Sequence, residues 1–326
     1  MHFRTVILGI TPVVCMSRSI AESYVVNQNV VRWQPLYLMC LSFAICVVGS
    51  MPGLQAGTIG FSIQLNFGSG FTAGQMAAFN AAKSTWQGYI TGYRDTVINS
   101  VLTIQANSVA KDGVGGLLGS AGPRSAKFGL EHNYLYARSG LMEFDTADLA
   151  SLEADGTLTS LIVHEMGHVL GLGTLWSSSA LGYKGYQELY VAGTGQYTGA
   201  DALAAWRSEF SQPNATFVPV EMAGGAGTAN AHWNEVDGGA GPTGYISNLT
   251  GQDFRDELMT GWLNGPAFIS TVTLGGLSDL GYTLNTSASN FGTANNSAAV
   301  PEPSTLILST LAALAACCSR QRRPAV

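Results

Sequence analysis

The sequence predicts a fold that mixes helices and strands, of the α/β or α+β class, and two observations lead to that prediction. In the first half of the central region, strand-like and helix-like apolar patterns alternate along the chain. In the second half, glycine, alanine, tyrosine and serine dominate, and the patterns fade. The hydrophobic content of 46%, with 11% charged residues and 40 glycines, fits a loop-rich protein with a sizeable core.

The first predicted elements are a strand, a helix and a second strand. Residues 61–67 (FSIQLNF) alternate apolar and polar side chains, as a half-buried strand does. Residues 72–90 carry apolar side chains at helical spacing, and Thr72 is placed to cap that helix. Residues 97–110 favour another strand, and the glycine-rich residues 112–126 follow it.

The second predicted helix runs from Thr157, its candidate N-cap, to about Leu170, and Gly171 is placed to end it. On this helix His164 and His168 lie about 40° apart on one face. The opposite face is apolar, so the helix buries its back and turns two imidazoles toward a cleft. The residues of the apolar face are Leu158, Ile162, Val163, Met166, Val169 and Leu170.

Beyond Gly173 the expected elements are short. Helical patterning is weak around residues 201–210 and clearer around residues 273–280, and residues 224–244 have the composition of a loop. The polar residues 285–300 are typical of a linker. The expected organisation is an N-terminal region (1–56), a central domain (57–284, with subdomains of about 57–173 and 174–284), the linker (285–300) and a tail (301–326).

The N-terminal region contains a predicted secretory signal. Arg32 precedes an apolar run from Leu36 to Val48, and the sequence LQA that ends at Ala56 fits a cleavage site. A buried core helix is the alternative interpretation of this run.

The tail predicts membrane retention during export. Pro301, Glu302 and Pro303 lead into the apolar residues 306–318, and three arginines follow. This order resembles the PEP-CTERM sorting signal of exopolysaccharide-producing Gram-negative bacteria. The resemblance implies an exosortase-type sorting machinery as a partner and a location at the cell surface or in the extracellular matrix. An ordinary single-pass anchor is the alternative.

Charge and cysteine usage exclude some functions for the central domain. Residues 57–300 carry nine Lys and Arg against nineteen Asp and Glu, a net charge of -10, so nucleic acid is not an expected partner. None of the five cysteines lies between residues 47 and 316. Cysteine is therefore excluded as a metal ligand, a nucleophile or part of a disulfide framework there.

The sequence LIVHEMGHVLGLGTLW, residues 161–176, contains the HExxH motif. Two imidazoles four residues apart on a helix can chelate one tetrahedral zinc ion, here through His164 and His168. Glu165 is placed to take a proton from the attacking water and to give it to the leaving amine. Two surface histidines on a core helix are the alternative interpretation.

A catalytic zinc site usually has three protein ligands, and the third one is not in this motif. Many zinc peptidases place it where this chain has Thr174. His232, 64 residues after His168, is the first choice for the third ligand, and His132 is a weaker one. The glutamates that remain as alternatives are Glu188, Glu209 and Glu235.

Three short segments together resemble the metzincin zinc peptidases: HEMGHVLGLGTLW, the isolated AHW at 231–233 and ELMTG at 257–261. The resemblance is strongest to the leishmanolysin family, in which the third histidine follows a long insertion. It spans residues 57–285 and implies an α+β fold. That fold has an N-terminal subdomain with a twisted sheet and the active-site helix, and a loop-rich C-terminal subdomain.

The same resemblance implies an exported zinc endopeptidase that binds one Zn²⁺ and acts on peptides or proteins. It implies His164, His168 and His232 as ligands, Glu165 as the general base, and Met259 in a turn beneath the metal. Residues 113–119 would then be an edge strand that pairs with an extended substrate, with a glycine-rich hairpin as the alternative.

The chain departs from the family pattern at two points. Its central domain has no cysteine, so a cysteine-switch propeptide cannot operate, and no tyrosine directly follows the methionine turn. Two other functions remain as alternatives: a non-catalytic surface or matrix protein with this fold, and a zinc amidohydrolase with a non-peptide substrate.

Overall fold

The structure is a computed structural model that describes residues 60–235, 241–264 and 267–285, all within one compact unit, Gln55–Val326. The predicted signal segment and the sorting tail lie outside the described residues. Among the residues that are described, no helix has both the length and the apolar character needed to cross a membrane.

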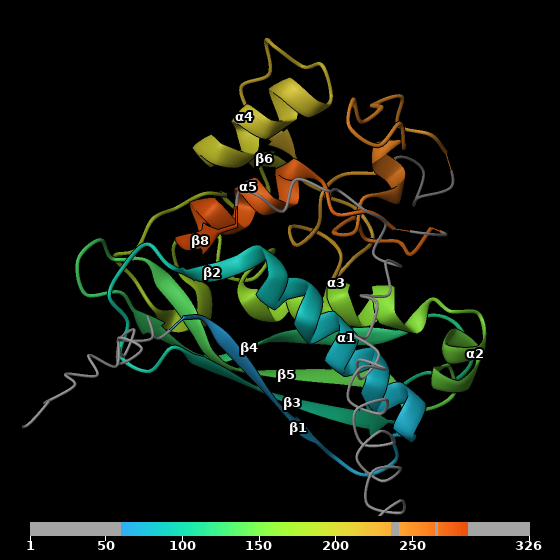
Figure 1. Ribbon diagram of the computed structural model, residues 1–326. Helices are drawn as coiled ribbons and strands as arrows, with labels where there is room; N and C mark the ends of the chain where they lie inside the picture. The colour runs from blue at the N-terminus through green and yellow to red at the C-terminus, as the bar shows by residue number, and fades with distance from the viewer. Residues whose placement is uncertain (1–59, 236–240, 265–266, 286–326) are drawn as a thin grey trace, which may run out of the picture. The chain divides into compact units, whose positions relative to one another are not determined.

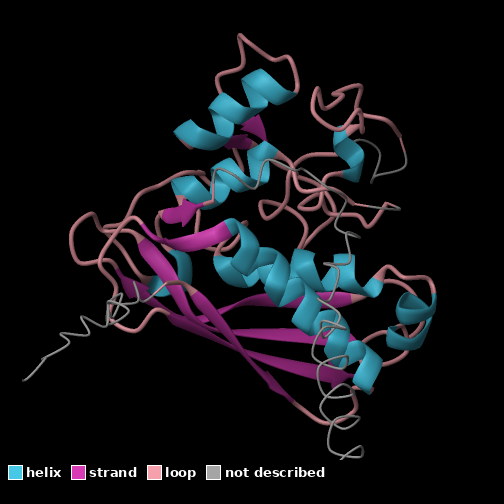
Figure 2. Ribbon diagram, viewed as in Figure 1, coloured by secondary structure: helices cyan, strands magenta, loops and turns pink. Residues whose placement is uncertain are grey.

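The first half of the unit is a four-stranded mixed sheet with helices on one face (Figures 1 and 2). The strands lie in the order β1-β3-β5-β4. The first three of these run parallel, and β4 pairs antiparallel with β5 at the edge. This arrangement agrees with the predicted α+β class. The bounds are β1 (Ser62–Phe67), β3 (Val101–Val109), β4 (Gly119–Phe128) and β5 (Leu135–Asp145).

The sheet is larger than the sequence patterns predicted. The glycine-rich residues 112–126, expected to follow the second strand, include most of β4, and β5 was not predicted at all. The prediction of an edge strand at residues 113–119 is wrong, because this segment is a series of bends and β4 begins only at Gly119. Glycine and Pro123 lower the strand propensity of β4, but an edge position tolerates them, and β5 supplies the backbone partners.

Two long helices, α1 (Ala73–Tyr89) and α3 (Leu158–Leu170), cover the same face of the sheet (Figure 1). They contact each other through Trp86, whose indole N–H donates to the Val163 carbonyl at 2.9 Å. Helix α3 approaches β5 closely, because a Cβ at Gly140 would lie 2.3 Å from Val169 Cγ1. The predicted ends of both helices agree with the structure to within one residue.

The N-terminal caps of the two helices differ. Thr72 forms the predicted cap of α1 as part of a capping box, in which its side chain and that of Gln75 each accept the other residue's backbone N–H. Thr157 occupies the N-cap position of α3, but its side chain makes no capping hydrogen bond. A short helix, α2 (Leu149–Ala154), ends just before it, and the Thr157 N–H donates to Leu152 instead.

The second half has few regular elements, as expected. Helices α4 and α5 form close to where the sequence predicted helices, around residues 201–210 and 273–280, and they pack against each other. The last strand, β8, pairs antiparallel with β2 and so connects the end of the unit to the end of α1. The bounds are β2 (Ile90–Tyr93), β6 (Gln196–Tyr197), α4 (Ala200–Glu209), β7 (Val218–Pro219), α5 (Thr271–Asp279) and β8 (Tyr282–Leu284), with 3-10 turns η1 (Ala180–Gly182) and η3 (Phe254–Asp256).

Candidate metal centre

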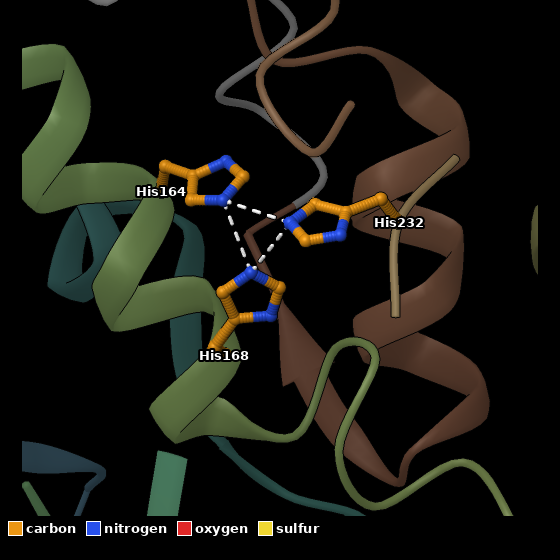
Figure 3. A group of neighbouring side chains, drawn as sticks. All are labelled: His164, His168 and His232. Carbon is orange, nitrogen blue, oxygen red and sulfur yellow. Dashed lines mark hydrogen bonds between the residues drawn. The ribbon is translucent and has the colours of Figure 1, made fainter. Parts of the chain in front are cut away.

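Three histidines meet where α3 faces the second half of the unit. His164 and His168 come from α3, and His232 comes from the loop between β7 and η3. Figure 3 shows their rings pointing toward one another. The Nε2 atoms are 3.0 to 3.1 Å apart in all three pairs. The structure thus brings together the three histidines named from the sequence, in a group that could hold a metal ion.

The other nitrogen of each ring is fixed by a backbone carbonyl. The Nδ1–H of His164 donates to the Leu258 carbonyl at 2.6 Å. The Nδ1–H of His168 donates to the Leu172 carbonyl at 2.9 Å, and that of His232 to the Thr228 carbonyl at 3.0 Å. A neutral imidazole has one N–H, so these bonds leave a lone pair on each Nε2.

Three inward lone pairs at this separation can share one cation as their common partner. In a tetrahedral zinc site with bonds of about 2.1 Å, ligand atoms lie about 3.4 Å apart, close to the spacing seen here. The donor set therefore fits a metal that prefers nitrogen.

Burial keeps the three rings in the neutral form that binds metals. It lowers the pKa of His164 to about 3, with a further contribution from the nearby His232. Burial, with the two neighbouring rings, lowers the pKa of His168 well below its ordinary value, and burial also lowers that of His232. At neutral pH the Nε2 lone pairs are therefore free to coordinate.

Two glycines after α3 bring the His232 loop against the helix. Gly171 ends the helix with φ at 120°. Gly173 has φ at 73°, and a Cβ there would lie 2.0 Å from the carbonyl oxygen of Ala231. This contact places the residue before His232 directly on the helix end. Thr174, where the sequence motif lacks a histidine, donates its hydroxyl to the His168 carbonyl at 2.6 Å.

The segment around Met259 lies against both parts of the site. A Cβ at Gly167 would lie 2.6 Å from the Met259 sulfur, so this glycine makes room for the methionine beneath α3. The preceding residue, Leu258, supplies the carbonyl for His164. The carbonyl of Met259 accepts the N–H of Trp233, the residue after His232, at 3.0 Å. The segment therefore positions two of the three imidazoles.

Glu257, which was not among the site residues predicted from the sequence, holds this segment in place. Its buried carboxylate accepts the N–H of Met259 at 2.6 Å and hydrogen bonds from Ser270 and Thr273. Burial raises the pKa of Glu257 to about 7. The same Thr273 hydroxyl accepts the indole N–H of Trp233 at 2.8 Å. The only signal for this network in the sequence was the position of Glu257 in ELMTG, two residues before the methionine.

Glu165 is buried on α3, next to His164 in the sequence, and 4% of its surface is exposed. Its Oε2 has no hydrogen-bond partner among the described residues. Its Oε1 lies against the start of β4, where a Cβ at Gly119 would be 3.0 Å away. Burial raises the pKa of Glu165 to about 8, although the charge of Lys111 acts in the opposite direction. A carboxyl group in this state can hold and release a proton near neutral pH.

The structure does not bring the alternative third ligands to the three histidines. Glu188 is bound by Ser178, Glu209 by the Ser247 and Thr271 hydroxyls, and Glu235 by the N–H of Gly261. His132 lies in a different group, where its ring is 2.8 Å from Asp95. Among the alternatives weighed from the sequence, only His232 joins the pair on α3.

No protein-family profile matches the chain, and no curated protein matches it in sequence.

Proposed function

We propose that the protein is a zinc endopeptidase of the metzincin type, with the leishmanolysin-like arrangement in which the third ligand lies on a distant loop. His164, His168 and His232 hold the ion in this proposal. Neutral imidazoles favour zinc over magnesium or calcium, which prefer oxygen ligands. The observation that carries the proposal is a buried carboxylate with a free oxygen, that of Glu165, on the helix that supplies two of the three converging Nε2 atoms.

When bound, zinc supplies Lewis-acid chemistry to water and to the carbonyl of the scissile bond. Glu165 takes the proton of the attacking water on Oε2, the oxygen that no protein group occupies. It then delivers this proton to the nitrogen of the leaving amine. A metal site with a purely structural role needs no such base.

A peptide substrate is supported by the edge strand of the sheet. Among the described residues, β4 pairs with another strand on one side only, through β5. Its first residue, Gly119, lies against Glu165. An extended peptide that adds a strand to this edge would pass beside the proposed base. The Met259 segment supports the site from below, as the methionine turn of the metzincins does.

In the same proposal the protein is exported. The signal segment directs secretion, and the PEP-CTERM-like tail recruits an exosortase-type machinery that places the domain at the bacterial cell surface or in the extracellular matrix. Association with the membrane through the tail is transient or permanent.

The test combines a metal assay with digestion of casein and of a broad peptide library. The wild-type protein should contain about one zinc per chain and cleave peptide bonds. Glu165→Gln should retain zinc and lose at least about a hundredfold in rate, because general-base catalysis contributes this much or more. Glu188→Gln, at an exposed glutamate, should match the wild type. Full activity of Glu165→Gln would refute the mechanism, and a zinc-loaded protein that hydrolyses only non-peptide amides would refute the peptidase assignment.

A further inference from the structure

A second candidate metal site lies in the loop of residues 111–118, which connects β3 to β4. Three aspartates bind this loop. Asp145 accepts the N–H groups of residues 112 and 113 at 2.9 and 3.0 Å, and Asp148 accepts that of residue 115 at 2.8 Å. Asp112 accepts that of residue 117 at 3.1 Å. The loop therefore folds around carboxylates that come from the end of β5, from the N-cap of α2 and from the loop itself.

The second oxygen of Asp148 has no partner. Asp148 is 3% exposed, and Oδ1 binds the loop, while Oδ2 is buried without a hydrogen bond to any described residue. The only other such side-chain oxygen in the described part of the chain belongs to Glu165. Leaving a buried carboxylate oxygen unpaired is costly, so a cation bound at Oδ2 would remove this cost.

No basic side chain supplies that partner. Asp145 is also buried, and neither it nor Asp148 forms an ion pair with a described residue. The lysine of this loop, Lys111, pairs with Glu143 at 3.3 Å and donates to Ser120. Both oxygens of Asp145 accept backbone N–H groups, those of residues 112, 113 and 147, whereas Asp148 keeps one oxygen unpaired and has no described basic side chain beside it.

The loop also offers neutral oxygen ligands. The carbonyl oxygens of residues 112–117 accept no hydrogen bond from the described residues. Gly113, Gly115 and Gly116 have φ between 75° and 90°, which gives this short segment the freedom to turn its carbonyls inward. The three carboxylates do not lie as close together as the three imidazoles do, so carbonyl ligands would complete the coordination.

We propose that this loop binds a calcium ion centred on Asp148 Oδ2, with Asp112 and Asp145 as further candidate ligands. Calcium accepts six to eight oxygen ligands in irregular geometry, whereas magnesium requires a near-ideal octahedron and zinc favours nitrogen and sulfur. This proposal does not require that the three histidines bind zinc or that the protein is a peptidase.

The ion would fix the start of β4. The loop ends at Gly119, the residue that contacts Glu165, so calcium would also order one wall around that carboxylate. Calcium would thus stabilise the unit and the edge strand together.

The test is a calcium titration of the full chain, followed by calorimetry and thermal unfolding, with zinc kept saturating. The wild type should bind one calcium ion with a Kd on the order of 10⁻⁵ to 10⁻³ M. At a hundredfold excess over Kd the melting temperature should rise by about 5 to 10 °C. Asp148→Asn should abolish this rise, since it removes the unpartnered oxygen's charge.

Asp279→Asn is the matched control, because Asp279 is also buried and binds backbone N–H groups, but both of its oxygens have partners. This variant should keep the calcium-induced rise even if its starting stability falls. Should Asp148→Asn fail to fold, Asp112→Asn, at an exposed position, should weaken calcium binding at least tenfold. A wild type without a calcium response, or an Asp148→Asn or Asp112→Asn variant with the full response, would overturn the proposal.

Discussion

Gly173 shows how one residue determines whether the site can assemble. Its positive φ and its missing side chain let the backbone of the His232 loop contact the end of α3. The sequence GLGTLW does not reveal this role of Gly173, because nothing in it indicates that the distant His232 loop will contact the glycine. The pair on α3 could be predicted from helical spacing, and His232 from the scarcity of histidines. The three carbonyls that orient the rings could not, because they belong to irregular segments.

Gly173→Ala should weaken metal binding at least tenfold. Its Cβ would collide with the Ala231 carbonyl and displace His232. Gly182→Ala is the control, because Gly182 has φ at 76° but open space around it. Both variants carry the same backbone strain of about 1 kcal/mol, and only the first disturbs the site. Competition with a chromogenic zinc chelator measures the affinities, and equal affinities would contradict this role of Gly173.

At the scale of elements, the two long helices were predictable, whereas the short helix α2 and half of the sheet were not. Helices α1 and α3 have strong apolar periodicity and glycine or capping signals at their ends, and these local features fix their bounds. The strands β4 and β5 depend on each other, and β4 has a glycine- and proline-containing sequence of low strand propensity. Its conformation is decided by pairing, which a local pattern does not reveal.

Thr72→Ala should lower the free energy of unfolding by about 1 kcal/mol, because it removes the side-chain half of the α1 capping box. Thr157→Ala should change it by no more than about 0.5 kcal/mol, because Thr157 makes no capping bond. Urea unfolding at fixed zinc concentration compares the two. Equal losses in both variants would show that the cap geometry does not decide the effect.

At the scale of the whole unit, buried acids connect elements that are distant in sequence. Asp279 at the end of α5 accepts the N–H groups of residues 201 and 202 at the start of α4, as well as the Tyr197 hydroxyl. Burial raises the pKa of Asp279 to about 6 from an ordinary value of 3.8. The folded state therefore binds this proton more tightly than the unfolded state does.

The raised pKa makes the stability fall as pH increases. The contribution of Asp279 is complete below pH 3.8 and is lost as pH rises through about 6, a change of about 3 kcal/mol. Asp279→Asn removes this titration, so the difference in unfolding free energy between wild type and variant should shrink across that range. Chemical denaturation at half-unit pH steps from 3.5 to 7 measures it. A difference that is constant with pH would contradict the shift.

The distance along the chain between His168 and His232 has a thermodynamic consequence. A metal ion bound to both closes a loop of 64 residues. If chain entropy is treated as it is for a disulfide, such a cross-link lowers the entropy of the unfolded chain by the equivalent of about 4 kcal/mol. The central region has no cysteine to form covalent cross-links. An ion in this site would thus act as the cross-link of a central region that has no thiols.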